Sequence, residues 1–145
     1  MPVELRTDVQ VLTVLKAVLA AAAPSEGCAL LLGCRRGSSW QLRWIWPCCN
    51  AWDAPVERVR RFAIDPREQL LAQKWGRARG LEVLGAAHSH PHSDAQPSGT
   101  DLELTFRPAL MVILGQGGDC RAWWLPDPCG ALPAAPLQLP WRMDD

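Results

Sequence analysis

The pattern of apolar and polar positions predicts an amphipathic helix over Thr7–Ala23 near the start of the chain. Its apolar face would consist of Val11, Leu12, Leu15, Val18 and Leu19. Thr7, followed by Gln10 three residues later, matches a capping box at the start of a helix. Pro24 is expected to end the helix, because proline cannot continue the backbone hydrogen bonding.

Apolar and alternating runs farther along the chain predict β-strands. Cys28–Cys34 and Ala109–Gly115 are continuous apolar runs, which are typical of strands buried on both faces. Trp40–Trp46 alternates, so that one face would carry Trp40, Leu42, Trp44 and Trp46. Further strands are predicted over Glu57–Ile64, Leu81–Ala87 and Cys120–Leu125, the last after a hairpin turn at Gln116–Asp119.

A second helix has clear signals at both ends. Asp65 is a suitable N-cap residue, Pro66 favours the first helical position, and Glu68 stands at the third. The helix would run to about Arg79 and close at Gly80. Its predicted buried positions are Leu70, Leu71 and Trp75.

The order of these elements predicts a mixed α/β fold, with a mostly antiparallel or mixed sheet flanked by helices. A short helix is expected to begin at Ser98 and to end before Pro108. We expect one domain over residues 1–125 and an extended, Pro- and Ala-rich tail over residues 126–145. The tail residues expected to pack are Leu137, Leu139 and Trp141.

Composition excludes several classes of protein. Lys plus Arg and Asp plus Glu both number 15, and this balance argues against a nucleic-acid partner or an acidic membrane surface. The apolar stretch after Lys16 is too short to cross a bilayer. Glu4 and Asp8 precede it, so the segment lacks the positive start of a signal peptide.

The chain has 6 cysteines but no Cys-x-x-Cys pair, which disfavours a thiolate zinc site. Cys28 and Cys34 lie in an apolar run, where a free cysteine behaves as a small hydrophobic residue. We therefore expect a reduced, cytoplasmic protein.

Candidate chemistry is concentrated around His88 and His90. On an extended segment two residues at this spacing point to the same face, and Asp101 follows eleven residues after His90. Two imidazoles and a carboxylate are good zinc ligands, and a catalytic zinc keeps a fourth position for water. Ser98 and Asp101 also match a capping box, which needs no metal and would help to aim the carboxylate. His92 is expected to be an exposed loop residue rather than a ligand.

Two other families of His-x-His enzymes do not fit the chain. Barrel-type amidohydrolases need about 250 residues, and this chain has 145. Zinc deaminases need His-x-Glu followed by Pro-Cys-x-x-Cys, and neither pattern occurs in the sequence.

The spacing resembles the JAMM (MPN+, Mov34/PAD-1) metalloprotease family. That pattern is an upstream Glu, then His-x-His, seven residues, Ser, two residues and Asp, which here is met by Glu26, His88, His90, Ser98 and Asp101. The resemblance extends over about residues 7 to 125, and includes the segment 26–33 and, in the middle region, Asn50 with residues 61–66.

Membership of this family implies an MPN fold, in which a curled sheet surrounds a helix as in cytidine deaminases. It implies one zinc held by His88, His90 and Asp101, with Glu26 as general acid and base and Ser98 steadying the oxyanion. The chain resembles the short, stand-alone prokaryotic members of the family. This resemblance implies a peptidase or isopeptidase that acts after the C-terminal Gly-Gly of a ubiquitin-like or sulfur-carrier protein. Alternatives are a catalytically silent binding or scaffold module of the same fold, and a metal-dependent hydrolase of a small amide.

Overall fold

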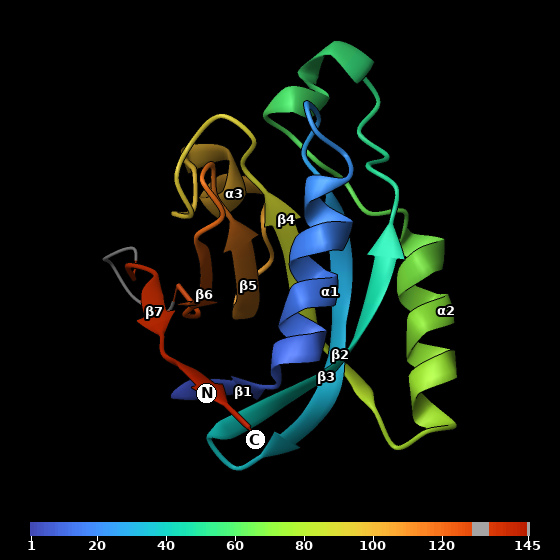
Figure 1. The fold of residues 1–145 in the computed structure, drawn as a ribbon, viewed down its shortest axis with the longest axis vertical. Helices are drawn as coiled ribbons and strands as arrows, with labels where there is room; N and C mark the ends of the chain where they lie inside the picture. The colour runs from blue at the N-terminus through green and yellow to red at the C-terminus, as the bar shows by residue number, and fades with distance from the viewer. Residues whose placement is uncertain (129–133, 145) are drawn as a thin grey trace.

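The structure, a computed structural model, describes residues 1–128 and 134–144. Three α-helices lie in this part of the chain: α1 (Val9–Ala20), α2 (Pro66–Arg77) and α3 (Gly99–Leu104). The strands are β1 (Glu4–Thr7), β2 (Cys28–Arg36), β3 (Ser39–Cys48), β4 (Glu82–Ser89), β5 (Ala109–Leu114), β6 (Cys120–Leu125), β7 (Leu137–Leu139) and β8 (Trp141–Met143). A 3-10 helix, η1 (Pro55–Val59), follows β3 (Figure 1).

The strands form one mixed sheet in the order β7-β6-β5-β4-β2-β3-β1-β8. Strand β4 pairs parallel with β5 and antiparallel with β2, while β1 pairs parallel with both β3 and β8. The expected mixed α/β fold, with a curled sheet and flanking helices, is confirmed. Among the residues that the structure describes, no helix combines the length and apolar character needed to cross a membrane.

The C-terminal segment joins the two edges of the sheet. Strands β7 and β8, separated only by Pro140, occupy opposite ends of the strand order. The Pro140 carbonyl accepts a hydrogen bond from Leu5 N–H at 3.1 Å, and the Trp141 indole donates to the Cys120 carbonyl at 2.9 Å. Leu139 is buried and Trp141 packs against the core, whereas Leu137 is largely exposed. This segment therefore supplies both edge strands of the sheet, one beside β6 and the other beside β1.

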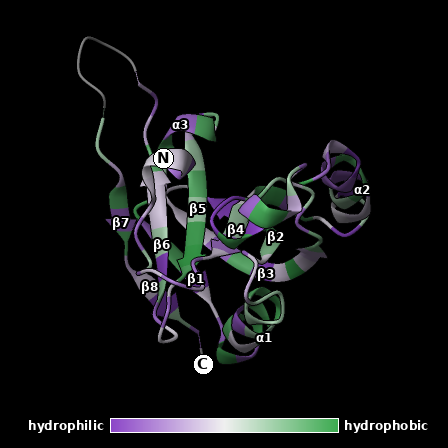
Figure 2. Cartoon of the chain, turned by 90° about the horizontal axis from the view of Figure 1, so that it is seen from above, coloured by the Kyte–Doolittle hydropathy of each residue, from purple (hydrophilic) through white to green (hydrophobic). Residues whose placement is uncertain are grey.

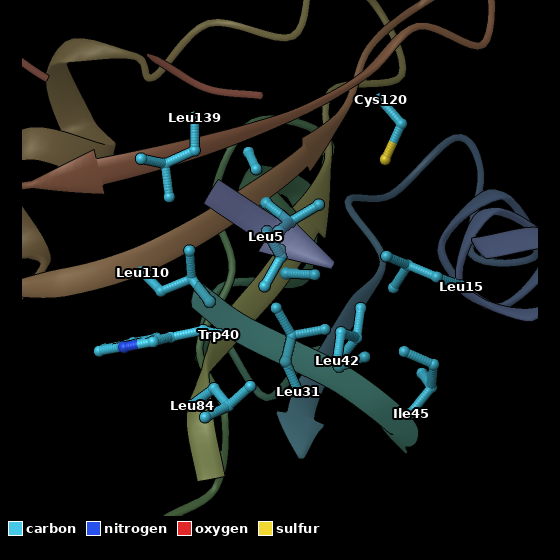
Figure 3. Close-up of a cluster of buried hydrophobic side chains, with 14 of the residues drawn as sticks. Leu5, Leu15, Leu31, Trp40, Leu42, Ile45, Leu84, Leu110, Cys120 and Leu139 are labelled. Carbon is cyan, nitrogen blue, oxygen red and sulfur yellow. The ribbon is translucent and has the colours of Figure 1, made fainter. Parts of the chain in front are cut away.

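Helix α1 lies inside the curl and fills the main core. Leu15 and Leu19 are fully buried among side chains from most of the strands. Figure 3 shows Leu15 in this core together with Leu31 and Leu42. The predicted apolar face of this helix is confirmed. Its predicted N-cap was wrong: Thr7 belongs to β1, and Asp8 caps the helix by accepting a hydrogen bond from the Val11 N–H at 2.8 Å.

Helix α2 packs on the opposite face of β2 and β4 (Figure 2). Its Asp65 cap is confirmed, but Leu70 and Leu71 are 65% and 53% exposed rather than buried. The buried positions are Ala72 and Gly76, with Trp75 partly buried beside them. Only small residues fit at these positions: a Cβ on Gly76 would come 2.8 Å from the Leu81 carbonyl oxygen in the connection to β4 and 3.1 Å from Leu32 Cδ2 in β2.

Strand β3 contains an irregularity that its alternating sequence does not reveal. Leu32 pairs with Trp44 but the next residue of β2, Gly33, pairs with Leu42, so Arg43 is an extra residue in the ladder. Trp44 and Trp46 therefore lie on the face that α2 covers, opposite to Trp40 and Leu42. The prediction of one continuous tryptophan face was wrong for this reason.

The predicted strand over Glu57–Ile64 is not present. The 3-10 helix η1 begins at Pro55, and residues 60–64 form an irregular segment that leads into α2. The arginines on both faces of this stretch leave it no continuous apolar side to bury in a sheet.

The cysteines that the structure describes form no disulfide, and Cys129 lies outside the described residues. Burial raises the pKa of the Cys28 thiol to about 12 and that of Cys120 to about 11. Both thiols are therefore neutral and poorly nucleophilic at physiological pH.

A matched pair of Leu→Ala variants tests this packing. Leu31→Ala should lower the free energy of unfolding by about 2–5 kcal/mol, because Leu31 is 0% exposed in the main core. Leu70→Ala makes the same chemical change on exposed α2 and should cost less than about 0.5 kcal/mol. Urea unfolding followed by circular dichroism measures both values, and equal losses would contradict the assignment of the core.

Candidate active site

The two histidines come from the end of a central strand. His88 lies in β4, directly between Cys28 of β2 and Ile113 of β5, and its side chain is fully buried. His90 follows the strand, and its N–H donates to the Leu114 carbonyl at 2.8 Å. Through this bond the chain stays paired with β5 for one residue beyond the end of β4. The extended backbone thereby brings the two imidazoles together, as the spacing predicts.

Three potential ligand atoms converge at one point. His88 Nε2 lies 3.1 Å from His90 Nε2, and each lies 3.0 Å from Asp101 Oδ2. All three side chains are buried. Within the described residues this is the one group of His, Cys, Asp or Glu side chains close enough to hold a metal ion. His92 is exposed and is not a member of the group.

Asp101 is aimed by the cap of α3, which lies beside the end of β4 (Figure 1). Its N–H donates to Ser98 Oγ at 3.0 Å, while Asp101 Oδ2 accepts from the Ser98 N–H at 2.9 Å. The predicted capping box is therefore present with both of its bonds. The same carboxylate oxygen that faces the histidines is fixed by this cap.

The orientation of His90 is set by a loop contact. Its Nδ1 lies 2.7 Å from the Asp94 carbonyl oxygen, which can only accept a hydrogen bond. When the ring is neutral, Nδ1 therefore carries its proton, and Nε2 has a lone pair free to bind a metal ion. The Trp123 indole holds this loop by donating to the Ala95 carbonyl at 2.8 Å.

Glu26 approaches the cluster from the segment before β2. The Gly27 N–H donates to Ser89 Oγ at 2.8 Å, and the Ser89 N–H donates to the Gly27 carbonyl at 3.0 Å. These reciprocal bonds fasten Glu26 beside the residue that separates the two histidines. The side chain of Glu26 is buried, and its Oε1 has no hydrogen-bond partner among the described residues.

A family model, described as prokaryotic homologs of the JAB domain, matches residues 8–126 of the chain. The chain belongs to this family. The match confirms the JAMM/MPN+ resemblance of the motif, and it leaves β7 and β8 outside the matched segment.

Two curated proteins are similar to this chain over most of its length. A "Desampylase" of Pyrococcus furiosus is 35% identical over 114 residues, which cover 77% of this chain and 76% of the relative. A "Probable TtuB-protein conjugate cleaving protease" of Thermus thermophilus is 32% identical over 105 residues. This second match covers 72% of the present chain and 65% of the relative's length.

Solved structures share the JAB-domain architecture. The solution structure of a protein from Desulfitobacterium hafniense has a TM-score of 0.83 and 27% sequence identity, covering 97% of this chain and 93% of that one. A solution structure from Salinibacter ruber, also 27% identical, has a TM-score of 0.60 and covers 89% of this chain and 96% of that one.

The electrostatics of the cluster favour a negative Asp101. Burial alone would raise the pKa of Asp101, but hydrogen bonds with His88, His90 and the Ser98 N–H outweigh burial and lower it. Burial lowers the pKa of His88. Burial also opposes the charged form of His90, but its bonds to Asp101 and to the Asp94 carbonyl raise its pKa overall. An anionic carboxylate beside a neutral His88 is the ligand state that a metal requires.

A cleft of about 680 Å³ opens beside the cluster. His88 and Asp101 contribute to its lining, together with Gly85, Ala86 and Phe62. The Phe62 ring stacks on the His88 ring with centroids 4.4 Å apart and planes 20° apart. The lining is mainly apolar, and near His88 it is built from small residues, so a bound chain could reach the His88 and Asp101 side of the cluster.

Several residues that complete the site were missed in the sequence. Ser89 bonds the Glu26 segment, Phe62 covers His88, and the Asp94 carbonyl orients His90. Asp94 contacts His90 through its backbone carbonyl, which every residue type has, so the sequence could not reveal this contact. Ser89 could have been suspected, because a polar residue between two inward-facing histidines must point to the opposite, buried face of the strand.

The pKa of Glu26 predicts how the stability of the metal-free protein depends on pH. Burial raises this pKa from 4.5 to about 7, with the charges of His90 and Asp101 as smaller, opposing influences. The folded state therefore holds a proton that the unfolded chain releases in this interval. The stability that Glu26 contributes is present below about pH 4.5 and is lost as the pH rises through about 7.

Glu26→Gln cannot ionise and isolates this effect from the other titrating groups. In the presence of a chelator, its melting temperature should match that of the wild type at about pH 4.5 and exceed it at about pH 8. Thermal unfolding at the two pH values measures the difference. A constant difference at both would contradict the burial of an ionisable Glu26.

Proposed function

We propose that the protein is a zinc-dependent metalloprotease that hydrolyses the amide bond after the C-terminal Gly-Gly of a ubiquitin-like or sulfur-carrier protein. The observation that carries this proposal is the convergence of His88 Nε2, His90 Nε2 and Asp101 Oδ2 within 3.0–3.1 Å of one another. Two imidazoles and one carboxylate form a donor set that suits a catalytic zinc with one open position.

The spacing of these atoms supports zinc in particular. Bonds of about 2.0–2.1 Å to a tetrahedral ion place neighbouring ligand atoms roughly 3.3 Å apart. The three atoms already lie close to this separation, so little movement is needed to bind the ion. The buried Nδ1 of His88 has no partner among the described residues, and a ring that is held by a metal at Nε2 and by Phe62 stacking would keep its orientation without one.

The substrate class rests on the relatives and on the cleft. Both curated relatives match over most of this chain, and one is named for cleaving a protein conjugate. The cleft beside His88 has room for an extended chain, and Gly85 and Ala86 add no bulk to its wall. A Gly-Gly terminus is the kind of chain that can lie close to such a wall and present its amide bond to the site.

The residues of the chain divide the chemistry among them. When bound, zinc would act as a Lewis acid and lower the pKa of a water from about 15.7 to about 7. Glu26 accepts a proton as the water attacks the amide carbon, and then delivers this proton to the nitrogen of the leaving amine. The pKa of Glu26, raised by burial to about 7, suits a group that must both accept and release a proton.

Ser98 can stabilise the oxyanion without leaving its cap. Its Oγ accepts the Asp101 N–H, and a hydroxyl keeps one hydrogen to donate while it accepts. The oxyanion that forms when the amide carbon becomes tetrahedral can receive that hydrogen bond.

The cysteine thiols have no part in this mechanism. We propose that the enzyme works in the reducing cytoplasm.

Linear fusions test the proposal most directly. Small proteins that end in Gly-Gly, taken from the same genome, are fused to a reporter and incubated with the enzyme, and the products are identified by mass spectrometry. We expect cleavage after the second Gly, its loss with a chelator, and its return when zinc is added back. Glu26→Gln should keep its zinc but lose about 10²–10⁴-fold in kcat.

The control distinguishes the proposal from a silent binding module. A zinc-loaded wild type that binds the carrier protein but cuts no fusion or isopeptide conjugate would contradict the proposed activity. Glu26→Gln with the kcat of the wild type would contradict the assigned role of Glu26.

A further inference from the structure

Asn50, the only asparagine of the chain, joins three segments around the site. It lies two residues after the end of β3 and is partly buried. Its Nδ2 donates to the Glu26 carbonyl at 3.0 Å and to the Arg61 carbonyl at 2.9 Å. Its Oδ1 accepts from the Trp52 N–H at 3.1 Å and from the Ala63 N–H at 3.3 Å.

These four bonds use every hydrogen-bonding position of the amide, two donors and two acceptor lone pairs. Asn50 therefore has no capacity left for a metal or a reacting oxygen. All four partners are backbone groups, so its effect on the site must pass through the position of the backbone.

The hydrogen bonds of Asn50 form a bridge between the Glu26 segment and residues 61–63. One side of this bridge holds Glu26. The Glu26 carbonyl is held by Asn50, and the Glu26 N–H donates to the Arg58 carbonyl at 2.7 Å. The carboxylate itself gains no support on Oε1, which has no partner among the described residues. The backbone clamps therefore decide where the carboxylate lies.

The other side of this bridge holds the wall over His88. The Arg61 carbonyl and the Ala63 N–H flank Phe62, and both bond to Asn50. Phe62 stacks on His88 at 4.4 Å. A single amide thus sets the position of Glu26 relative to the aromatic wall that packs on the cluster.

We propose that Asn50 is a positioning residue that holds the Glu26 carboxylate and the Phe62 wall in register for the reaction. This inference rests on the proposed protease function. Asn50 touches neither the ligand atoms nor the position of the reacting bond, so it acts on the rate through Glu26 rather than as a catalytic residue.

Asn50→Asp is the sharpest variant, because it keeps the shape and an acceptor oxygen but replaces the two N–H donors by a carboxylate oxygen that faces two carbonyls. A displacement of the order of 1 Å can cost about 100-fold in rate. We expect kcat to fall by about 10–100-fold, while KM and the zinc content per chain stay within twofold of the wild type. The amide hydrogen of Glu26 should exchange at least 10-fold faster, because the Glu26 segment loses the bond from Asn50 Nδ2 to its carbonyl.

Thr7→Val is the matched control. Like Asn50→Asp, it removes a hydrogen bond from a side chain to a backbone carbonyl, here from the buried Thr7 hydroxyl to the Leu42 carbonyl at 3.2 Å. Thr7 lies at the end of α1 that is far from Glu26. It should leave kcat and the exchange of the Glu26 amide unchanged, even if the melting temperature falls. An equal loss of kcat in Thr7→Val would overturn the inference, because general destabilisation would then explain both variants.

The two proposals fail in different ways. If wild-type protein cleaves fusions and Asn50→Asp does so with unchanged kcat, the positioning role is overturned and the protease function stands. If the wild type cleaves nothing, the protease function fails, and amide exchange of Glu26 that is unchanged in Asn50→Asp would overturn the bridge independently.

Discussion

The crowding of two imidazoles and a carboxylate at one buried point is the constraint on which the site depends. Atoms of His88, His90 and Asp101 lie 3.0–3.1 Å apart and all three residues are almost inaccessible to water. Burying such groups is costly unless they are paired with one another or with a cation. The fold meets this condition by bringing the two histidines at the end of β4 next to the carboxylate at the capped start of α3.

The reactive group is held by a different part of the molecule. Glu26 follows the end of α1, and a Cβ on Gly27 would lie 2.3 Å from the Leu19 carbonyl oxygen, so the chain can enter β2 this close to the helix only with glycine. Ser89 then ties this segment to the histidines from the opposite face of β4. The position of the helix inside the curled sheet thus determines how near the proposed base lies to the proposed metal.

Local signals were the ones that the sequence revealed well. The Asp65 cap, the Ser98–Asp101 box and the apolar face of α1 depend on neighbouring residues, and the structure confirms all three. Features that depend on distant partners were missed. The extra residue at Arg43, the close contact of Gly76 with the sheet and the closure by β7 and β8 each depend on the partner backbone. The same applies to the site, since the motif identifies the proposed ligands but not the hydrogen bonds that the Asp94 carbonyl and Asn50 make around them.

X-ray absorption at the zinc edge of the purified protein tests the proposed metal centre most directly. We expect about one zinc per chain with only nitrogen and oxygen neighbours at about 2.0–2.1 Å, two of them imidazoles. Asp101→Ala should lose most of this zinc while the fold remains. Sulfur neighbours at about 2.3 Å, or full zinc content in Asp101→Ala, would contradict a centre built from His88, His90 and Asp101.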